Sequence, residues 1–355
     1  MERVFMSYEL NKKIRELEPY EPISGTYKIR LDANECPVSY PEEIMKQVRE
    51  AIEKIDFNRY PDPLATEVVN SFSEYYGINP DCVTAGNGSD ELIFLTESAF
   101  LEKGEKMLVV APDFSMYNFY SSICEVECDS FIKDESLNFD VDALIEKING
   151  DNIKLVIFSN PCNPTGQGIT AEQARRLVTS VNALVILDEA YMDFWNQSLI
   201  AETEKYSNLI VFRTASKSVG SAALRLGFAV ANKTISKALK AVKSPYNVNS
   251  ISQAIGTVIY KNKEYLLNRQ KAIVSNREKL YNGLVEIAEK YKSLTVYNSC
   301  ANFVFVKTPE GKAIWEYLKS NSIVIRYMGD YIRISAGTEQ EVDETLCCIE
   351  KYFMG

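Results

Sequence analysis

Short apolar, β-branched runs alternate with stretches of helical periodicity through the middle of the chain, and this alternation limits the possible folds more than any other feature. Runs that are apolar at every position are typical of strands buried on both faces of a parallel sheet. Helices between them supply the crossovers that parallel neighbours require. The sequence therefore predicts an α/β fold with a mostly parallel central sheet and helices on both faces. The expected strands are residues 107–111, 155–159, 183–188, 209–213 and 227–231.

The pattern changes near residue 262. A long helix is expected at about 265–290 and a last helix from Glu339, with short strands between them, which predicts a smaller α+β domain. Upstream, a helix is expected to begin at Pro41, with two acidic residues in its first turn. The expected organisation is an N-terminal segment docking on the small domain (1–44), a large domain (45–262) and a small C-terminal domain (263–355).

The chain of 355 residues contains no histidine. This excludes His metal sites, Ser-His-Asp and Cys-His nucleophile systems, and imidazole acid–base catalysis. Proton transfer near neutral pH must then use Lys, Tyr, Cys or a carboxylate, or be delegated to a cofactor. The formal net charge of −10 argues against nucleic acid or an anionic membrane as the main partner.

The eight cysteines form no C-x-x-C pair, so reduced and mostly buried thiols are expected. No apolar stretch approaches the length of a membrane span, and the N-terminus lacks a basic-then-apolar signal pattern. We therefore expect a cytoplasmic protein without membrane or metal.

Lys217 lies just after the expected strand 209–213, among small hydroxyl residues and near Arg225. Open α/β sheets bind ligands at the carboxyl ends of their strands. A lysine there, with hydroxyls and an arginine, suits a phosphate together with a carbonyl held as an imine. The alternative is a solvated loop lysine.

Two neighbouring strand exits also carry polar side chains. Strand 183–188 delivers Asp188 and then Tyr191, and its acid could bind a metal or a ribose, pair with a protonated pyridine nitrogen, or cap a helix. Residues 159–166 contain two prolines and a glycine, which fix a rigid turn that can aim the Asn163 amide. That segment could equally be a plain strand-to-helix loop.

A glycine-rich turn, Gly86-Asn87-Gly88, opens a helix at Ser89 and Asp90. Backbone N–H groups at a helix start form a natural phosphate seat, although a simple helix cap is compatible with the same residues. The turn matches neither G-x-G-x-x-G nor Walker A, so nucleotide binding is not indicated. Phe114 follows strand 107–111, where its ring could stack on a flat ligand or pack in the core.

In this order and spacing, these segments resemble the class I/II aminotransferases of the fold-type I, pyridoxal-phosphate-dependent class, and more closely their histidinol-phosphate aminotransferase branch. The resemblance extends along the chain, although Cys36 stands where the branch usually has Asn and the segment 327–332 is shorter than in many members. Further motifs that carry it are Glu18-Pro19-Tyr20, Leu31-Asp32-Ala33-Asn34-Glu35, Arg59-Tyr60-Pro61-Asp62-Pro63, Pro245-Tyr246-Asn247-Val248-Asn249, Ala301-Asn302-Phe303-Val304 and Arg333-Ile334-Ser335.

The resemblance implies pyridoxal 5'-phosphate as cofactor, bound by the large domain, and a homodimer. It implies catalytic roles for Lys217 as the Schiff-base lysine and proton carrier, for Asp188 at the pyridine nitrogen and for Tyr191 at the phenolic oxygen. The further cofactor-binding residues that it implies are Ser89, Asp90, Phe114, Asn163, Ser216 and Arg225, with Thr214 nearby and Tyr60 acting on the partner subunit. The implied substrate-binding residues are Arg333, Arg326, Tyr20 and Asn247.

The activity implied by the resemblance is transamination between L-histidinol phosphate and 2-oxoglutarate in histidine biosynthesis. Decarboxylation of threonine phosphate, or transamination of aromatic or other amino acids, remains open on the same scaffold. A non-enzymatic alternative is an aminotransferase-like sensor domain of a regulator. Such a regulator needs a basic DNA-binding module, and no such pattern precedes Pro41.

Overall fold

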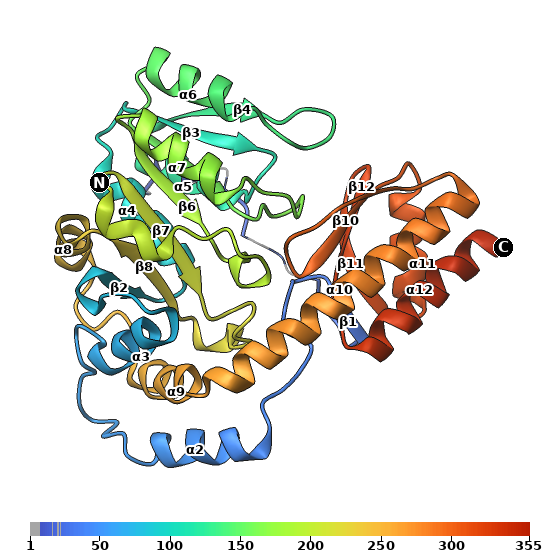
Figure 1. Cartoon of the computed structure of the whole chain (residues 1–355), viewed down its shortest axis with the longest axis horizontal. Coiled ribbons are helices and arrows are strands. Elements are labelled where there is room, and N and C mark those ends of the chain that lie inside the picture. The colour runs from blue at the N-terminus through green and yellow to red at the C-terminus, as the bar shows by residue number, and fades with distance from the viewer. Residues whose placement is uncertain (1–7, 16, 20, 22) are drawn as a thin grey trace, which may run out of the picture.

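The computed structural model describes residues 8–15, 17–19, 21 and 23–355. Its large domain is built on a seven-stranded sheet (Figure 1). Five neighbouring strands are parallel, which confirms the mostly parallel sheet. In sheet order the strands are β2 (Val83–Gly86), β8 (Gly227–Ala231), β7 (Leu209–Thr214), β6 (Leu184–Asp188), β5 (Leu155–Ser159), β3 (Lys106–Ala111) and β4 (Glu127–Ile132).

The expected strand 227–231 forms but runs antiparallel to both neighbours, β7 and β2. Residues 215–226, which connect β7 to β8, form only the short 3-10 helix η4 (Ala222–Leu224). Adjacent parallel strands need a longer crossover, so this short connection returns the chain antiparallel. The same connection carries Lys217. Strand β4 escaped sequence reasoning because it is an edge strand with exposed and half-buried positions instead of an apolar run.

Helices cover both faces of this sheet. On one face the apolar core is shared with α3 (Thr66–Tyr76), α6 (Val141–Gly150), α7 (Ala171–Ser180) and α9 (Ser250–Lys261). The other face packs against α4 (Ser89–Phe100), α5 (Met116–Cys124) and α8 (Lys233–Val242).

The small domain holds a five-stranded sheet covered on one face by helices. Its strands, in sheet order, are β1 (Ile29–Leu31), β11 (Ile323–Met328), β12 (Tyr331–Ser335), β10 (Phe303–Lys307) and β9 (Thr295–Tyr297). The four C-terminal strands pair antiparallel, whereas β1 adds in parallel to β11. The helices are α10 (Lys263–Tyr291), α11 (Gly311–Ser320) and α12 (Glu339–Met354).

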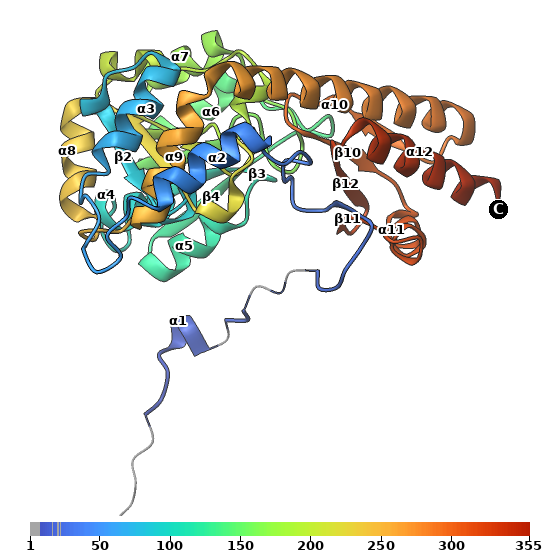
Figure 2. The same ribbon diagram turned by 90° about the horizontal axis from the view of Figure 1, so that it is seen from below.

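The N-terminal segment and α10 link the two domains. Helix α10 runs from the large domain to the small one (Figure 2): Leu266 belongs to the large-domain core, and Leu280 and Leu284 belong to the small-domain core. Helix α2 (Glu42–Ile52) packs on α9 of the large domain, so that domain takes in residues before 45. Helix α1 (Lys12–Arg15) contacts α5 of the large domain, so the N-terminal segment touches both domains.

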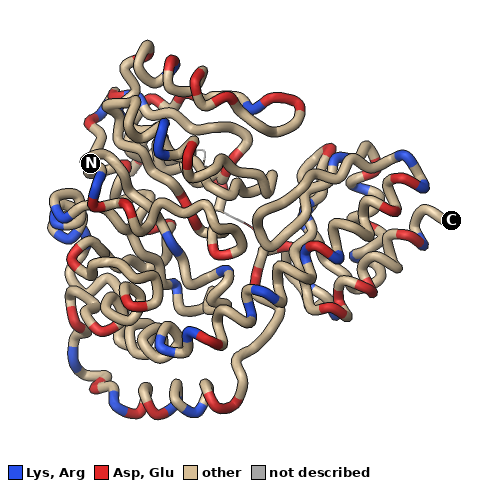
Figure 3. Tube along the Cα trace, in the orientation of Figure 1, with Lys and Arg blue, Asp and Glu red and all other residues tan. Residues whose placement is uncertain are grey.

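Acidic and basic residues are interspersed over both domains, so the net negative charge is spread over the surface (Figure 3). Within the described ranges, no helix is both long and apolar enough to cross a membrane.

Candidate active site

The carboxyl ends of β5, β6 and β7 meet at one edge of the large sheet, because these strands are parallel and in register. Lys217 lies in the turn after β7 and is half-buried. Its Nζ donates a hydrogen bond to the carbonyl oxygen of Ala33 at 3.0 Å and lies 5.7 Å from the centre of the Tyr191 ring. The structure thus brings together Lys217, which follows β7, and Tyr191, which follows β6.

Asp188 ends β6 and is only 4% exposed. Its carboxylate accepts hydrogen bonds from two neutral donors, the Tyr117 hydroxyl at 2.8 Å and the Ala190 amide at 3.1 Å. Burial raises the pKa of Asp188 to about 7, because the charged form is desolvated. A cationic N–H donor, such as the protonated ring nitrogen of the expected cofactor, would restore the ionised form. The residue therefore fits that cofactor.

Tyr117 is a site residue that sequence reasoning missed. It is fully buried in α5, and its ring lies edge-on to Phe114 with 5.6 Å between ring centres. Phe114 lies three residues before Tyr117, and the turn that opens α5 joins them, because the Tyr117 amide donates to the Phe114 carbonyl oxygen at 3.3 Å. That spacing was the available signal, and it connects the candidate stacking ring to the residue that orients Asp188.

Asn34 is a second missed residue, although the sequence motif that contains it was recognised. Its Nδ2 donates to the Tyr191 hydroxyl at 3.0 Å, and its Oδ1 accepts from Ser335 at 3.0 Å. Its own carbonyl accepts from the side chain of Asn302 at 3.1 Å. Asn34 therefore ties the Tyr191 hydroxyl to β12 and to the residue before β10 in the small domain.

The glycine turn and the β7–β8 connection form a polar cradle. An ideal Cβ on Gly227 would lie 2.5 Å from the carbonyl carbon of Gly88 and from the amide nitrogen of Ser89, so only glycine allows this approach. Arg225 pairs with Asp90 at 3.1 Å. Backbone N–H groups and a positive helix end at Ser89 suit a phosphate. Ser216, in the same β7–β8 connection as Arg225, is buried, and its Oγ lies 3.0 Å from Oγ1 of Thr214.

Arg333 reaches from the small domain to the large one. It is buried in β12, where one Nη donates to the carbonyl oxygen of Asp32 at 2.8 Å and the other donates to Oδ1 of Asn163. Arg326 lies directly opposite Arg333 in the β11–β12 pair and is half-buried. Directly opposite residues of an antiparallel pair project from the same face of the sheet, so Arg326 and Arg333 share a face, which suits binding of an anionic substrate.

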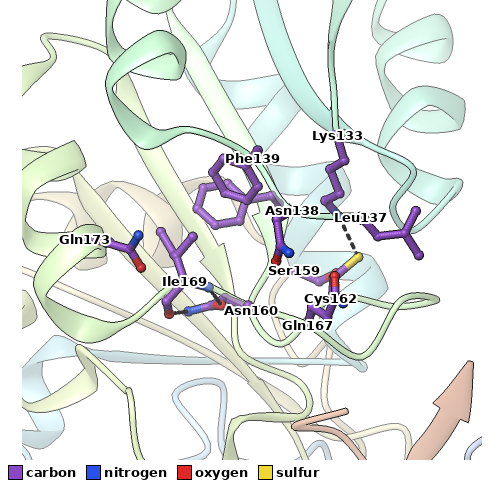
Figure 4. Close-up of a pocket in the computed structure, with 12 residues that line it drawn as sticks. Lys133, Leu137, Asn138, Phe139, Ser159, Asn160, Cys162, Gln167, Ile169 and Gln173 are labelled. Atoms are coloured by element: carbon purple, nitrogen blue, oxygen red, sulfur yellow. Dashed lines mark hydrogen bonds between the residues drawn. The ribbon is translucent and has the colours of Figure 1, made fainter. Parts of the chain in front are cut away.

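Lys133 joins the two loops that carry Phe114 and Asn163. Its Nζ donates to the carbonyl oxygen of Pro112 and to Sγ of Cys162, both at 2.9 Å. Figure 4 shows the bond to Cys162. Lys133 and Cys162 line a cavity of about 220 Å³. Burial raises the pKa of the Cys162 thiol, so this cysteine remains a neutral packing partner.

The structure describes two of the three remaining expected residues. Asn247 is held by Glu91, to which its Nδ2 donates at 2.7 Å, and by Lys243, which donates to its Oδ1 at 2.8 Å. Tyr60 is 82% exposed and stacks on Tyr246 with 4.6 Å between ring centres. Tyr20 lies outside the described residues.

Comparison with known proteins gives a consistent result. The family model for aminotransferases of class I and II matches residues 26–349. The histidinol-phosphate aminotransferase of Clostridium novyi (strain NT) is 39% identical over 344 residues, which are 96% of each chain. That of Clostridium kluyveri (strain NBRC 12016) is 36% identical and covers 96% of this chain and 97% of its own.

Among solved structures, the histidinol-phosphate aminotransferase of Sinorhizobium meliloti, in complex with pyridoxal-5'-phosphate, has the same fold. It covers 99% of each chain with a TM-score of 0.87, at 21% identity.

Proposed function

This chain belongs to the class I and II aminotransferases, and from that premise we propose that it transfers the amino group of L-histidinol phosphate to 2-oxoglutarate. It is an enzyme, and its cofactor is pyridoxal 5'-phosphate. The observation that carries the choice of substrate is the likeness, over nearly the whole length, to relatives of that name. The proposal places the reaction in histidine biosynthesis.

The residues at the edge of the large sheet would hold the cofactor. Its phosphate would lie on the helix start at Ser89 and Asp90, between Ser216 and Arg225, with Phe114 against its ring. When bound, the cofactor supplies an aldehyde that takes up amines and a ring that withdraws electrons.

The chain itself supplies the proton transfers and the charge. Lys217 would hold the cofactor and then, through the same Nζ, move a proton to and from the substrate carbon. The Asp188 carboxylate would keep a ring nitrogen protonated. Tyr191 and Asn163 would donate hydrogen bonds to the ring oxygen. Since the chain has no histidine, this lysine is the natural carrier of the proton.

Arg333 and Arg326 would bind the anionic groups of the substrates. Histidinol phosphate presents a phosphate, and 2-oxoglutarate presents two carboxylates, so both half-reactions need cationic partners. The planar guanidinium group binds such anions at two points. The domain-spanning contact of Arg333 with Asn163 would place the bound anion next to the cofactor ring.

We further propose a cytoplasmic homodimer. All eight cysteines are free thiols, as expected in a reducing compartment. Tyr60 and its stacking partner Tyr246 belong to an exposed apolar surface of the kind that subunits cover. The other exposed large apolar residues of the segments 57–64 and 246–251 are Phe57, Leu64 and Ile251.

A half-reaction screen tests the substrate. The cofactor-bound enzyme is mixed with single amino donors, and conversion of its aldehyde form to its amine form is followed by absorbance. We expect histidinol phosphate to give the highest kcat/KM, above phenylalanine, tyrosine and phosphothreonine. A tenfold preference for an aromatic amino acid, or carbon dioxide release from phosphothreonine, would replace the proposed substrate without touching the cofactor chemistry.

Arg326→Ala tests the anion site within the same screen. We expect kcat/KM to fall roughly ten- to a hundredfold for histidinol phosphate and for 2-oxoglutarate, the cost of one charge-assisted contact. The neutral side chain of phenylalanine should be affected less. Equal losses for all donors would show that Arg326 acts on the fold and not on the substrate anion.

A further inference from the structure

A buried ion cluster lies directly behind the residues proposed for catalysis. Arg213, the fifth residue of β7, is 4% exposed, and its guanidinium binds two carboxylates. The distances are 2.8 Å to Glu189 and 2.6 Å to Asp193. The guanidinium also lies 4.9 Å from the centre of the Tyr76 ring. In the sequence, Arg213 is the last residue of the expected strand 209–213.

The alternation of side chains along parallel strands produces this arrangement. Val185 and Leu187 of β6 pack in the same core as Val211 of β7, on the face covered by α3 and α9. Since side chains alternate, Glu189 and Arg213 continue along that face, whereas Asp188 points to the opposite face, toward Tyr117. The consecutive acids Asp188 and Glu189 therefore bind partners on opposite faces of the sheet.

Each partner of the cluster is a close chain neighbour of a proposed catalytic residue. Glu189 directly follows Asp188, and Asp193 lies two residues after Tyr191. Ser218 directly follows Lys217, and its hydroxyl donates to the second carboxylate oxygen of Asp193. The Arg213 guanidinium is therefore linked, through at most two contacts, to the segments that bear Lys217, Asp188 and Tyr191.

We propose that Arg213 is a positioning residue that fixes the distance between the Lys217 turn and the segment bearing Asp188 and Tyr191. The inference rests on the proposed function of these three residues. Arg213 is too deeply bound to touch substrate, so it acts through Asp193 and Ser218. Catalysis is sensitive to such spacing, because a shift of about 1 Å in a reacting group can lower the rate by roughly a hundredfold.

Ser218→Ala and Ser198→Ala are matched variants that test the link. Both remove one hydroxyl from the cluster, since Arg213 also donates to Ser198 at 2.9 Å. Only Ser218 is adjacent to Lys217. We expect Ser218→Ala to lower kcat of the amine half-reaction by about tenfold at unchanged KM, and to shift the pH midpoint of the bound cofactor's visible absorbance. Ser198→Ala should lower the melting temperature comparably and leave kcat and that midpoint unchanged.

Ser218→Thr, which keeps the hydroxyl, should restore kcat. Equal effects of the two alanine variants, or no effect of Ser218→Ala, would overturn the inference. Borohydride reduction tests the proposed function separately from the positioning role of Arg213. If the cofactor is fixed to Lys217 in every variant, the proposed function stands whatever the kinetics show.

Arg213→Lys and Arg213→Met test the arginine itself in the cofactor-bound protein. Removing the cation leaves two buried carboxylates, so Arg213→Met should lower the melting temperature strongly. Arg213→Lys keeps the charge but loses the two-point geometry. It should fold, with the same loss of kcat as Ser218→Ala. A normal kcat and a normal pH midpoint in Arg213→Lys would reduce Arg213 to a structural role.

Discussion

At the scale of single residues, the site contains a buried carboxyl group, that of Asp188, whose ionisation destabilises the fold when the cofactor is absent. Asp188 is buried among neutral donors, and burial raises its pKa to about 7. Its carboxylic acid is ionised in the unfolded chain from about pH 4 upward but keeps its proton in the folded chain until about pH 7. Folding stability therefore falls as the pH rises through that window, by up to a few kcal/mol. A bound cation at the same place removes this loss.

Asp188→Asn should therefore act in opposite directions on stability and on activity. Without cofactor, the variant should be more stable than the wild type at pH 8 and similar to it at pH 4, because the amide cannot ionise. With cofactor, turnover should fall by roughly two orders of magnitude, because the charge that holds the ring nitrogen protonated is gone. Melting curves and half-reaction rates measure the two effects.

Asp330→Asn is the control for stability, since Asp330 is exposed at the turn between β11 and β12. It should leave the pH profile unchanged. Near-normal turnover in Asp188→Asn would remove Asp188 from the proposed chemistry.

At the scale of elements, the strand β8 and the helix α4 form the proposed phosphate cradle by close backbone approach. A Cβ on Gly227 would overlap Gly88 and Ser89 at 2.5 Å, and backbone atoms cannot move aside cheaply. The requirement for glycine comes from this contact between two elements that are far apart in the sequence.

Gly227→Ala should displace the glycine turn and weaken cofactor binding by tenfold or more, consistent with about 1–3 kcal/mol for overpacking. Titration of cofactor-free protein, followed by absorbance, measures the affinity. Gly150→Ala is the matched control, because a Cβ there meets no atom within 4 Å. Unchanged affinity in Gly227→Ala would place the phosphate elsewhere.

Helix α4 also contains a buried acid that has no role in the proposed chemistry. Glu97 is fully buried, and neither of its carboxylate oxygens has a hydrogen-bond partner in the part of the chain that the structure describes. Burial raises its pKa to about 8. The unfolded chain releases this proton near pH 4.5, so stability falls as the pH rises from there to about 8.

Glu97→Gln should flatten this decline. In the cofactor-bound protein, where Asp188 no longer contributes, the melting temperature of the variant should exceed that of the wild type at pH 8 and approach it near pH 4. Glu286→Gln, an exposed position on α10, should behave like the wild type. Parallel pH profiles for Glu97→Gln and the wild type would contradict the assignment.

At the scale of the whole molecule, the proposed homodimer predicts that residues of both subunits contribute to each site. Tyr60 is exposed and stacks on Tyr246. A tyrosine in this place suits a role in the site of a second subunit.

Mixed dimers of Tyr60→Phe and Lys217→Ala subunits test this arrangement. If Tyr60 acts across the interface, both lesions fall in one site and the other site is wild type, so the mixed dimer should show half the wild-type activity. If Tyr60 acts within its own subunit, the mixed dimer should show only half the activity of Tyr60→Phe. Dimers of Lys217→Ala with wild-type subunits calibrate the value of one intact site.

Much of the fold and site could be predicted because the signals are local. Apolar runs identified β5, β6 and β7, and the residues that follow these strands identified Lys217, Asp188 and Asn163. This was possible because a buried strand and the turn that ends it are formed by consecutive residues. Strand β4 and the antiparallel direction of β8 lacked such a signal. Whether a strand lies at the edge of a sheet, and whether it runs parallel or antiparallel, depends on the neighbouring strands and not on its own residues.

The sequence by itself determined the central parallel strands β5, β6 and β7, the order of the motifs and the family. Only the tertiary structure decided which side chains meet. Asn34 binds Tyr191, Tyr117 binds Asp188, and Arg213 joins segments from two strands, because chain folding brings distant residues within hydrogen-bond distance. The pKa values of Asp188 and Glu97 were equally hidden, since they depend on removal of water by elements that no local pattern specifies.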